Sequence, residues 1–307
     1  MQHIHSLEEA KLDRPSVVTI GVFDGVHLGH RYLLARLMDH ARATGQSPVV
    51  LTFFPHPKAV LDSVGPGFYL TLPDDKASLL GDLGVECVVT HPFDDEVRHM
   101  RAAAFVDRLM KHLNMKSLWV GEDFALGYQR EGNVTFLRQQ AAEKGFELRA
   151  VDLMDAGDER VSSSRVRGLL AEGLVEEATR LLARPHFIRG TVVAGEKRGR
   201  TIGFPTANIE IPVELAIPAR GVYAGWVDLG DGQLPAVTNI GMRPTFDSSS
   251  AVTVETHLLD WNGDLYDREL VLCFTHRLRD EMKFGGIEQL VAQIGRDIES
   301  ARRLLGR

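Results

Sequence analysis

The first 150 residues alternate short, almost continuously apolar runs with stretches in which apolar residues recur at helical spacing. The apolar runs predict buried strands at 16–22, 48–54, 86–90, 117–121 and 147–153. Two intervening segments place their apolar residues on one helical face, and these residues are Leu33, Leu34, Leu37, Met38 and Ala41 in the first and Phe105, Val106, Leu109 and Met110 in the second. Apolar strands that alternate with helices predict a parallel sheet covered on both faces.

From about residue 185 the pattern changes to short strand-like runs separated by glycines and other turn residues. The predicted strands are 187–195, 221–229, 234–241, 251–259 and 269–276. Within one of them, Val252, Val254, Thr256 and Leu258 alternate with Thr253, Glu255 and His257, so that the two sets face opposite sides. This pattern predicts a small antiparallel barrel or sandwich.

A helix closes the chain, from Ile287 to Leu305. Its predicted inner face consists of Ile287, Leu290, Val291, Ile294, Ile298 and Ala301. The change of pattern near "ARPHFIRG" predicts two domains of different architecture, 1–184 and 185–307.

The composition of the chain excludes several classes of protein. The 307 residues are 44% hydrophobic and 25% charged, with a net charge of −7, and this acidic balance argues against a nucleic-acid partner. We find neither a signal peptide nor an apolar run long enough to span a membrane. Cys87 and Cys273 lie far apart in apolar surroundings, as thiols of a reducing compartment do. We therefore expect a cytoplasmic protein without a membrane partner, and the sequence leaves a homo-oligomer open.

The string "GVFDGVHLGH", residues 21–30, lies where a predicted strand ends and a helix begins. The amides and dipole of a helix start favour anions, and glycines allow a ligand close to the backbone. His27 and His30 are three residues apart and project from one side of the first turn, so both can stabilise charge on a transferring phosphoryl group. By itself, an H-x-G-H string is a pair of surface histidines in about half of cases. Here the strand before it and the helix after it favour a phosphate site.

Two further strings combine hydroxyls, basic residues and glycines. In "VSSSRVRGLLAEG" (161–173), serines at a helix start precede arginines, which suits either a plain capped helix or a triphosphate clamp. In "GTVVAGEKRGRTIGFPTANIE" (190–210), spaced glycines and a basic turn can cradle phosphates. Thr206 and Asn208, two apart on a strand, can present oxygens to Mg²⁺. From these residues alone, a glycine-rich hairpin with a solvated basic turn is the better interpretation.

Residues 21–30, "GVFDGVHLGH", resemble the nucleotide-binding element of the nucleotidylyltransferase superfamily. Residues 161–173 resemble the "ISSTxIR" element of bacterial FAD synthetases, with Val161 for Ile and Ser164 for Thr. "TFFPHP" (52–57) resembles the "TFxPHP" segment beside the flavin in that family, and "VGEDFALG" (120–127) resembles "VGxDFxFG", with Leu126 where Phe is usual.

Residues 190–210 resemble the riboflavin kinase signature "GxVxxGxxxGRxxGFPTAN". Further matches follow in the order of that family at 221–227, 239–246, 254–270, 278–290 and 293–302. Together the matches extend from Val17 to Arg302, and the chain resembles the bifunctional bacterial riboflavin kinase/FMN adenylyltransferases. One departure is Ala183 in "LLARP", where glycine is usual.

This resemblance implies an N-terminal nucleotidylyltransferase-type, Rossmann-like α/β domain with a parallel sheet, followed by a small antiparallel β-barrel with a closing helix. It implies two reactions, the phosphorylation of riboflavin to FMN by ATP and the adenylylation of FMN to FAD with release of pyrophosphate. It also implies Mg²⁺ as cofactor, ATP as co-substrate, and riboflavin, FMN and FAD as substrates or products.

The resemblance further assigns residues to each site. For adenylyl transfer the catalytic residues are His27, His30 and Arg167, and ATP is bound by these three with Gly21, Phe23, Asp24, Gly25, Ser162, Ser163 and Ser164. The flavin there contacts Pro55, His56, Pro57 and Asp123. For the kinase, ATP is bound by Gly195, Lys197, Gly199, Arg200, Gly203, Pro205, Thr206 and Asn208, and the last two hold Mg²⁺. Glu255 is the catalytic base, and Arg279 and Phe284 contact the flavin.

Three other functions deserve comparison. A nucleotidylyltransferase for another acceptor fits the first domain alone, but it gives no reason for the kinase signature. A flavin-binding protein without catalysis would not need His27, His30, Thr206, Asn208 and Glu255. A protein related to the class I aminoacyl-tRNA synthetases would need a lysine-rich "KMSKS"-type loop, which the chain lacks.

Overall fold

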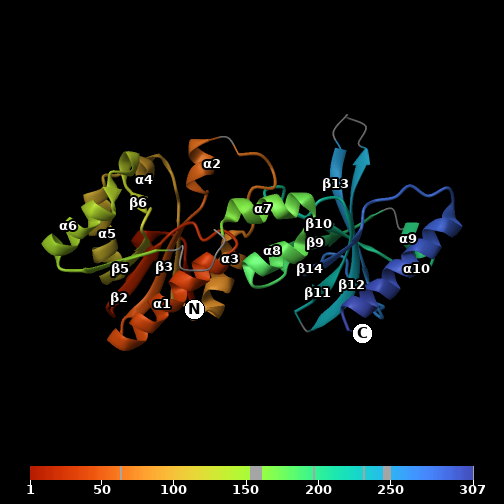
Figure 1. The fold of residues 1–307 in the computed structure, drawn as a ribbon, viewed down its shortest axis with the longest axis horizontal. Coiled ribbons are helices and arrows are strands. Elements are labelled where there is room, and N and C mark those ends of the chain that lie inside the picture. The colour runs from red at the N-terminus through yellow and green to blue at the C-terminus, as the bar shows by residue number, and fades with distance from the viewer. Residues whose placement is uncertain (63, 153–160, 196–197, 231, 245–249, 307) are drawn as a thin grey trace. The chain divides into compact units, whose positions relative to one another are not determined.

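The computed structural model describes residues 1–62, 64–152, 161–195, 198–230, 232–244 and 250–306 (Figure 1). The chain forms two compact units. The first contains Met1–Gly65 and Thr71–Ser163, and the second contains Pro66–Leu70 and Ser164–Arg307. Residues 164–184 thus pack with the second unit, and the functional boundary expected after residue 184 stays a prediction.

The first unit is built on a six-stranded parallel sheet in the order β1-β4-β3-β2-β5-β8. Its strands are β1 (Gln2–Ile4), β2 (Ser16–Ile20), β3 (Ser47–Phe53), β4 (Cys87–His91), β5 (Met115–Gly121) and β8 (Glu147–Val151). All five strands expected in this part of the chain are present. After β2 the chain builds outward through β3 and β4, and then β5 is added on the other side of β2. In such sheets ligands bind at this switch point, beyond the carboxyl ends of the strands.

Helices cover both faces of this sheet, which confirms the expected layering. On one face Val18 of β2 shares a core with Phe105 and Leu109 of α5, while on the other face Val17 packs with Leu37 of α1. The helices are α1 (Leu28–Thr44), α2 (Pro57–Leu61), α3 (Pro73–Asp82), α4 (Asp95–His99), α5 (Ala102–Leu113) and α6 (Val134–Lys144). A two-stranded ribbon, β6 (Ala125–Leu126) and β7 (Gly132–Asn133), follows β5.

The second unit contains a closed, six-stranded antiparallel barrel in the order β10-β13-β12-β11-β14-β9, with β9 pairing back to β10. Its strands are β9 (His186–Val193), β10 (Ala207–Glu210), β11 (Gly221–Asp228), β12 (Gln233–Pro244), β13 (Ser250–Leu258) and β14 (Glu269–Arg279). Closure decides between the barrel and the sandwich in favour of the barrel. Val254, Thr256 and Leu258 face the interior as expected, whereas Val252, near the start of β13, is 49% exposed.

The second unit also contains four helices in its described residues. They are α7 (Ser163–Glu172), α8 (Val175–Leu182), the short α9 (Arg198–Thr201) and the closing α10 (Ile287–Leu304). Val166 of α7 and Leu182 of α8 belong to the same core as the barrel interior. In α10, Ile298 and Ala301 pack against the barrel, but Ile287 is 66% exposed because it opens the helix, ahead of the turns that contact the strands. The expectation for Ile287 was therefore wrong.

The segment Pro66–Leu70 leaves the first unit and packs in the second. Its backbone pairs with residues 213–216, since the Gly67 amide donates to the Val213 carbonyl at 2.9 Å and the Ala216 amide donates to the Tyr69 carbonyl at 2.7 Å. Leu70 is fully buried in the core of the second unit. The chain therefore enters the second unit, returns to the first, and enters the second again at Ser164. None of the helices in the described ranges is both long and apolar enough to cross a membrane.

Candidate active sites

The turn that follows β2 has an unusual backbone. Phe23 has φ 51° and Val26 has φ 44°, both in the left-handed region that non-glycine residues rarely adopt, and Gly25 between them has φ 78°. Both non-glycine side chains are buried, so the core holds them in place. Strain of this kind is characteristic of sites where the backbone itself must be presented to a ligand. Gly21 lies under Phe23, since a Cβ there would come within 2.9 Å of the ring.

Hydrogen bonds from two distant segments hold this turn. Asp24 is buried, and its Oδ1 accepts from the Thr71 amide at 3.1 Å. The Thr71 Oγ1 in turn accepts from the Gly25 amide at 3.1 Å. From the end of the unit, the Ser163 hydroxyl donates to the Asp24 carbonyl at 2.9 Å. Asp24, Gly25 and Ser163, three of the expected ATP-binding residues, thus meet in one network, which Thr71 completes.

His27 and His30 lie at the start of α1. Their rings stack with centroids 3.7 Å apart and an interplanar angle of 15°, and the Phe23 ring lies 4.9 Å from His30. Gly29 lies beside this pair, since a Cβ there would be in ordinary contact with the His27 ring at 3.4 Å. The Nδ1 atoms of both histidines are buried without a hydrogen-bond partner among the described residues. Each is therefore a polar group that a ligand can satisfy.

Burial lowers the pKa of His27 to about 4 and holds the pKa of His30 well below its usual value. Both imidazoles are thus neutral at pH 7, and each can donate one hydrogen bond without carrying charge. His27 is also the N-cap residue of α1, with no side-chain hydrogen bond to the helix amides. The 17-residue helix consequently begins with amides that its N-cap residue does not cap, beside two imidazoles, which is an arrangement suited to phosphate oxygens.

Lys76 of α3 was not expected in this site. It is 2% exposed, and its Nζ donates to the Val22 carbonyl at 3.0 Å and to the Thr52 hydroxyl at 3.1 Å. Burial lowers the pKa of its ammonium to about 8, against the opposing effect of Asp24. The signal in the sequence was a lysine adjoining Ala77 and four positions before Leu80, on the apolar face of a helix.

The residues expected to contact the flavin in this unit follow β3 and β5, the two neighbours of β2. His56 caps α2 through its Nδ1, which accepts from the Lys58 amide at 2.9 Å, and Pro57 is the first residue of that helix, directly after Pro55 and His56. Asp123 is exposed in the turn after β5, and its carbonyl accepts from Arg130 at 3.0 Å. Since parallel strands end at one edge, these segments and the histidine pair share the carboxyl edge of the sheet.

The remaining adenylyl-transfer residues lie at α7. Ser162 precedes the helix, while Ser164 and Arg167 belong to the second unit. Arg167 donates to the Ser164 hydroxyl and to the Phe68 carbonyl, both at 3.2 Å, and its guanidinium lies 4.7 Å from the centre of the Phe68 ring. The expected place of Ser164 and Arg167 beside the histidines stays a prediction.

In the barrel, strand register places two asparagines beside Glu255. On β13, Glu255 is paired with Asn208 of β10 on one side and with Asn239 of β12 on the other. Directly paired residues project from the same face, so the carboxylate lies between two amide side chains. Asn239 was not expected from the sequence, because its place beside Glu255 follows from strand pairing.

The glycines expected to cradle ATP lie against the expected metal ligands. A Cβ on Gly195 would lie 2.7 Å from Asn208 Oδ1 and closer still to its Nδ2, so only glycine allows this approach. A Cβ on Gly199 would lie 3.3 Å from the exposed Thr206 Oγ1. These hydroxyl and amide oxygens are the hard donors that Mg²⁺ takes beside substrate phosphates, so the donor set fits the ion. Gly203 turns the chain with φ 89°, two residues before Pro205.

The expected ATP-binding residue Lys197 lies outside the described residues, and so does the side chain of Arg200.

His257 positions this segment, although it was not expected in the site. Its Nδ1 lies 2.7 Å from the Pro205 carbonyl, and because a carbonyl only accepts, Nδ1 carries the proton. Its ring meets Phe204 edge-on at 5.8 Å. His257 and Glu255 project from the same face of β13, two residues apart. The strand with the expected base thus also fixes the segment that bears Thr206.

Of the expected flavin contacts, Arg279 is the last residue of β14 and Phe284 lies between β14 and α10. The Arg279 guanidinium binds both carboxylate oxygens of the buried Asp297, at distances from 2.8 to 3.1 Å. It also lies 5.9 Å from the centre of the Phe284 ring. Arg279 therefore joins the end of the barrel to the closing helix, and its contact with a flavin stays a prediction.

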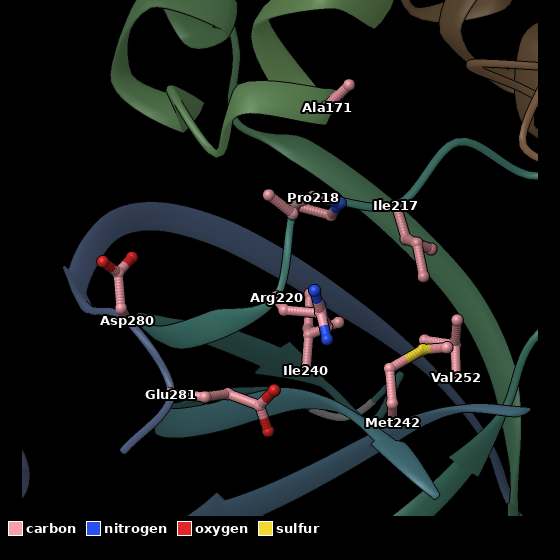
Figure 2. A pocket seen from close by; sticks show the side chains of 10 residues that line it. Ala171, Ile217, Pro218, Arg220, Ile240, Met242, Val252, Asp280 and Glu281 are labelled. Atoms are coloured by element: carbon pink, nitrogen blue, oxygen red, sulfur yellow. The ribbon is translucent and has the colours of Figure 1, made fainter. Parts of the chain in front are cut away.

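A cavity of about 670 Å³ opens at one end of the barrel (Figure 2). Figure 2 shows Met242 and Val252, which are paired across β12 and β13, together on one side of it, with Glu281 facing the same space. The Glu281 carboxylate and the Asn239 amide both lie against Gly241, at 2.6 and 3.3 Å from where its Cβ would be. Through Val252 the cavity adjoins β13, the strand that carries Glu255. Apolar side chains line most of the cavity, together with the charged Arg220, Asp280 and Glu281.

Comparison with known proteins matches two parts of the chain to two different family models. Residues 9–165 match the family model described as FAD synthetase, and residues 182–305 match the one described as riboflavin kinase. The bifunctional riboflavin kinase/FMN adenylyltransferase of Pseudomonas fluorescens is 39% identical over 99% of this chain and 98% of its own length. The protein of the same description from Escherichia coli K12 is 39% identical over 99% of this chain and 96% of its own.

Among solved structures, one described as a macrolide-efflux protein from Streptococcus pneumoniae superimposes with a TM-score of 0.88. It is 31% identical, and the match covers 98% of each chain. The similarity to the bifunctional enzymes extends over both units and includes every site described above. The chain belongs to the family of bifunctional riboflavin kinase/FMN adenylyltransferases.

Proposed function

We propose that this chain makes FAD from riboflavin in two ATP-dependent steps, at two sites with separate sets of residues. As a member of its family it phosphorylates riboflavin to FMN and adenylylates FMN to FAD. Residues 185–307 carry the kinase, and residues 1–184 carry the adenylyltransferase. The observation that carries this proposal is one cluster of polar side chains in each compact unit, Glu255 paired with Asn208 and Asn239 in one and the stacked histidine pair in the other.

In the kinase step, the terminal ribityl hydroxyl of riboflavin attacks the γ-phosphorus of ATP. The O–P bond forms as the bond to the β-phosphate oxygen breaks, and ADP leaves. Glu255 accepts the hydroxyl proton, and the flanking Asn208 and Asn239 orient its carboxylate and the phosphates. Thr206 and Asn208 would hold Mg²⁺, which neutralises phosphate charge when bound. Arg279 and Phe284 are the proposed contacts to the flavin.

In the adenylyl step, a phosphate oxygen of FMN attacks the α-phosphorus of a second ATP, and pyrophosphate leaves. The second pKa of a phosphate monoester is about 6, so this nucleophile is already ionised at pH 7 and the step needs no general base. The neutral His27 and His30 donate hydrogen bonds to the phosphates, and the first amides of α1 add their dipole. Arg167 and the serines at 162–164 bind the triphosphate, while Pro55, His56, Pro57 and Asp123 contact the flavin.

Small molecules are the proposed partners, in the cytoplasm, with no nucleic acid and no membrane. The acidic balance of the chain and its position in flavin synthesis support this view. Whether the chain acts alone or as a homo-oligomer is decided by its mass in solution.

Two substitutions test the assignment of the two activities to separate sets of residues. Glu255→Gln should abolish FMN formation from riboflavin and leave FAD formation from supplied FMN intact, whereas His30→Ala should do the reverse. Glu269→Gln, at an exposed glutamate of the same barrel, and His5→Ala, at an exposed histidine of the first unit, are the matched controls. Chromatography of the flavins reports both products in one run. Equal damage to both activities in a folded variant would refute the assignment of two sites.

A further inference from the structure

A buried cation lies beneath the adenylyl-transfer site, and the reaction described above does not use it. Lys76 projects from α3 to the carboxyl ends of β2 and β3, where its ammonium meets the Val22 carbonyl and the Thr52 hydroxyl. The Thr52 hydroxyl also donates to the same Val22 carbonyl, at 2.9 Å, which leaves its lone pairs for the lysine. The three groups form a closed network directly before the strained turn at 23–26.

Burial of an ammonium is costly, and a long apolar side chain such as methionine could fill the same space without this cost. The network around Lys76 offsets the cost only in part, because the pKa of the ammonium is lowered by burial in spite of nearby Asp24. A core lysine at 2% exposure therefore adds little to stability. What it does add is a positive charge and a fixed donor to the backbone of the turn.

A positive charge near the histidine pair would add to that of Arg167, which is assigned above to the triphosphate. Both imidazoles are neutral at pH 7, and a phosphoryl transition state gathers negative charge on its oxygens. The charged and titratable groups whose charge interacts with that of Lys76 are Asp24 from the turn, His30 from α1 and His3 from β1. Asp74 and Asp75 precede it on α3, and the Asp74 carboxylate lies beside His3. Burial lowers the pKa of His30 most, and the charges of His27 and Lys76 lower it further, so the positive charge of Lys76 reaches the histidine pair through space.

We propose that Lys76 is a positioning residue for adenylyl transfer, whose ammonium holds the Val22 carbonyl and keeps the turn and the histidine pair in place under a positive potential. This inference rests on the proposed assignment of adenylyl transfer to the first unit. Lys76 acts through the Val22 carbonyl, the Asp24 carboxylate and the neutral state of His30. Replacement of Lys76, or deprotonation of its ammonium, loosens the turn at 23–26 and removes the positive potential.

The experiment compares Lys76→Met, Lys76→Gln and Lys76→Arg in the full chain, with FAD formation from FMN and ATP measured from pH 6 to pH 10. The circular-dichroism spectrum and melting curve of each variant report whether the first unit is folded, and kinase activity on riboflavin, measured on the same samples, reports on the second unit. We expect Lys76→Met and Lys76→Gln to lower kcat/KM for FAD formation at least tenfold, with the kinase changed less than twofold. Lys76→Arg should restore most of the activity because it keeps the charge.

The pH profile separates positioning from mere packing. Deprotonation of Lys76 near its pKa of about 8 should make FAD formation by the unmodified protein fall above pH 8. The alkaline fall should move by at least one pH unit upward in Lys76→Arg, because a guanidinium stays charged, and it should be missing from the kinase profile.

Three outcomes would overturn the inference: Lys76→Met with FAD formation within twofold of the original, an alkaline fall that is absent from the unmodified protein, or one that is the same in Lys76→Arg. If Lys76→Met does not fold, the profiles of the unmodified protein and Lys76→Arg still decide. His30→Ala distinguishes failure of the inference about Lys76 from failure of the proposed function. Unchanged FAD formation in His30→Ala would show that adenylyl transfer does not take place in the first unit.

Discussion

The contact between Gly195 and Asn208 allows a steric test of the kinase site. Gly195→Ala adds one methyl group at a position where the backbone does not require glycine, since its φ is not in the left-handed region. The new Cβ would lie 2.7 Å from Asn208 Oδ1 and closer to Nδ2, whereas ordinary contact begins at 3.4 Å. Asn208 must therefore withdraw by more than about 1 Å, and a misplacement of about 1 Å in a catalytic site costs on the order of 100-fold in rate.

The assay is FMN formation from riboflavin and ATP, with FAD formation from FMN measured on the same sample. We expect kcat/KM for the kinase to fall on the order of 100-fold while adenylyl transfer is unchanged. Gly232→Ala is the matched control, because a Cβ at that exposed glycine of the same unit meets nothing within 4 Å. Kinase activity within twofold of the original in Gly195→Ala would show that Asn208 does not hold the metal or the phosphates.

Three further predictions address other contacts. His257→Phe removes the hydrogen bond to the Pro205 carbonyl, and we expect the KM for ATP in the kinase assay to rise several-fold; an unchanged KM would contradict a role for His257 in placing Thr206. Thr71→Val removes an acceptor of the Gly25 amide, a loss of about 1 kcal/mol, so FAD formation should fall while FMN formation does not, and Thr71→Ser should retain activity. His186 is buried with a pKa lowered to about 4, so the unfolded chain takes up the proton first, near pH 6.5. Urea unfolding of the second unit should therefore lose about 3 kcal/mol of stability as the pH falls from 6.5 to 4, and His186→Gln should flatten this dependence.

The alternation of apolar runs and helical segments was enough to predict the parallel sheet of the first unit, because strands buried on both faces are apolar along their whole length. The strand β1 was missed because three residues are too few to show a period. The barrel strand β13 was placed with its correct inner face by the alternation at Val254, Thr256 and Leu258. Ile287 was misplaced since periodicity identifies a helical face but not where along it the contact begins.

The candidate sites divide in the same way. Local strings disclosed the histidine pair and the glycine-rich run, since those residues lie close together in the sequence. Lys76, Asn239 and His257 were found only in the structure. In the sequence a buried lysine cannot be told from a surface lysine, because its burial depends on how its helix packs. Strand register brings Asn239 to Glu255 across 16 positions. No local pattern could place Pro66–Leu70 in the second unit, because its partners lie about 145 residues away and reach it only through tertiary folding.

The threading of Pro66–Leu70 has a consequence for attempts to divide the protein. A protease that cuts the backbone once, at the step from Ser163 to Ser164, would not release two independent pieces, because the fragment ending there would still leave five of its residues inserted in the other. A gene truncated to begin at residue 164 would yield a barrel that lacks Leu70 from its core and the main-chain partner of residues 213–216. Reconstitution from co-expressed halves should accordingly work better than expression of either half by itself.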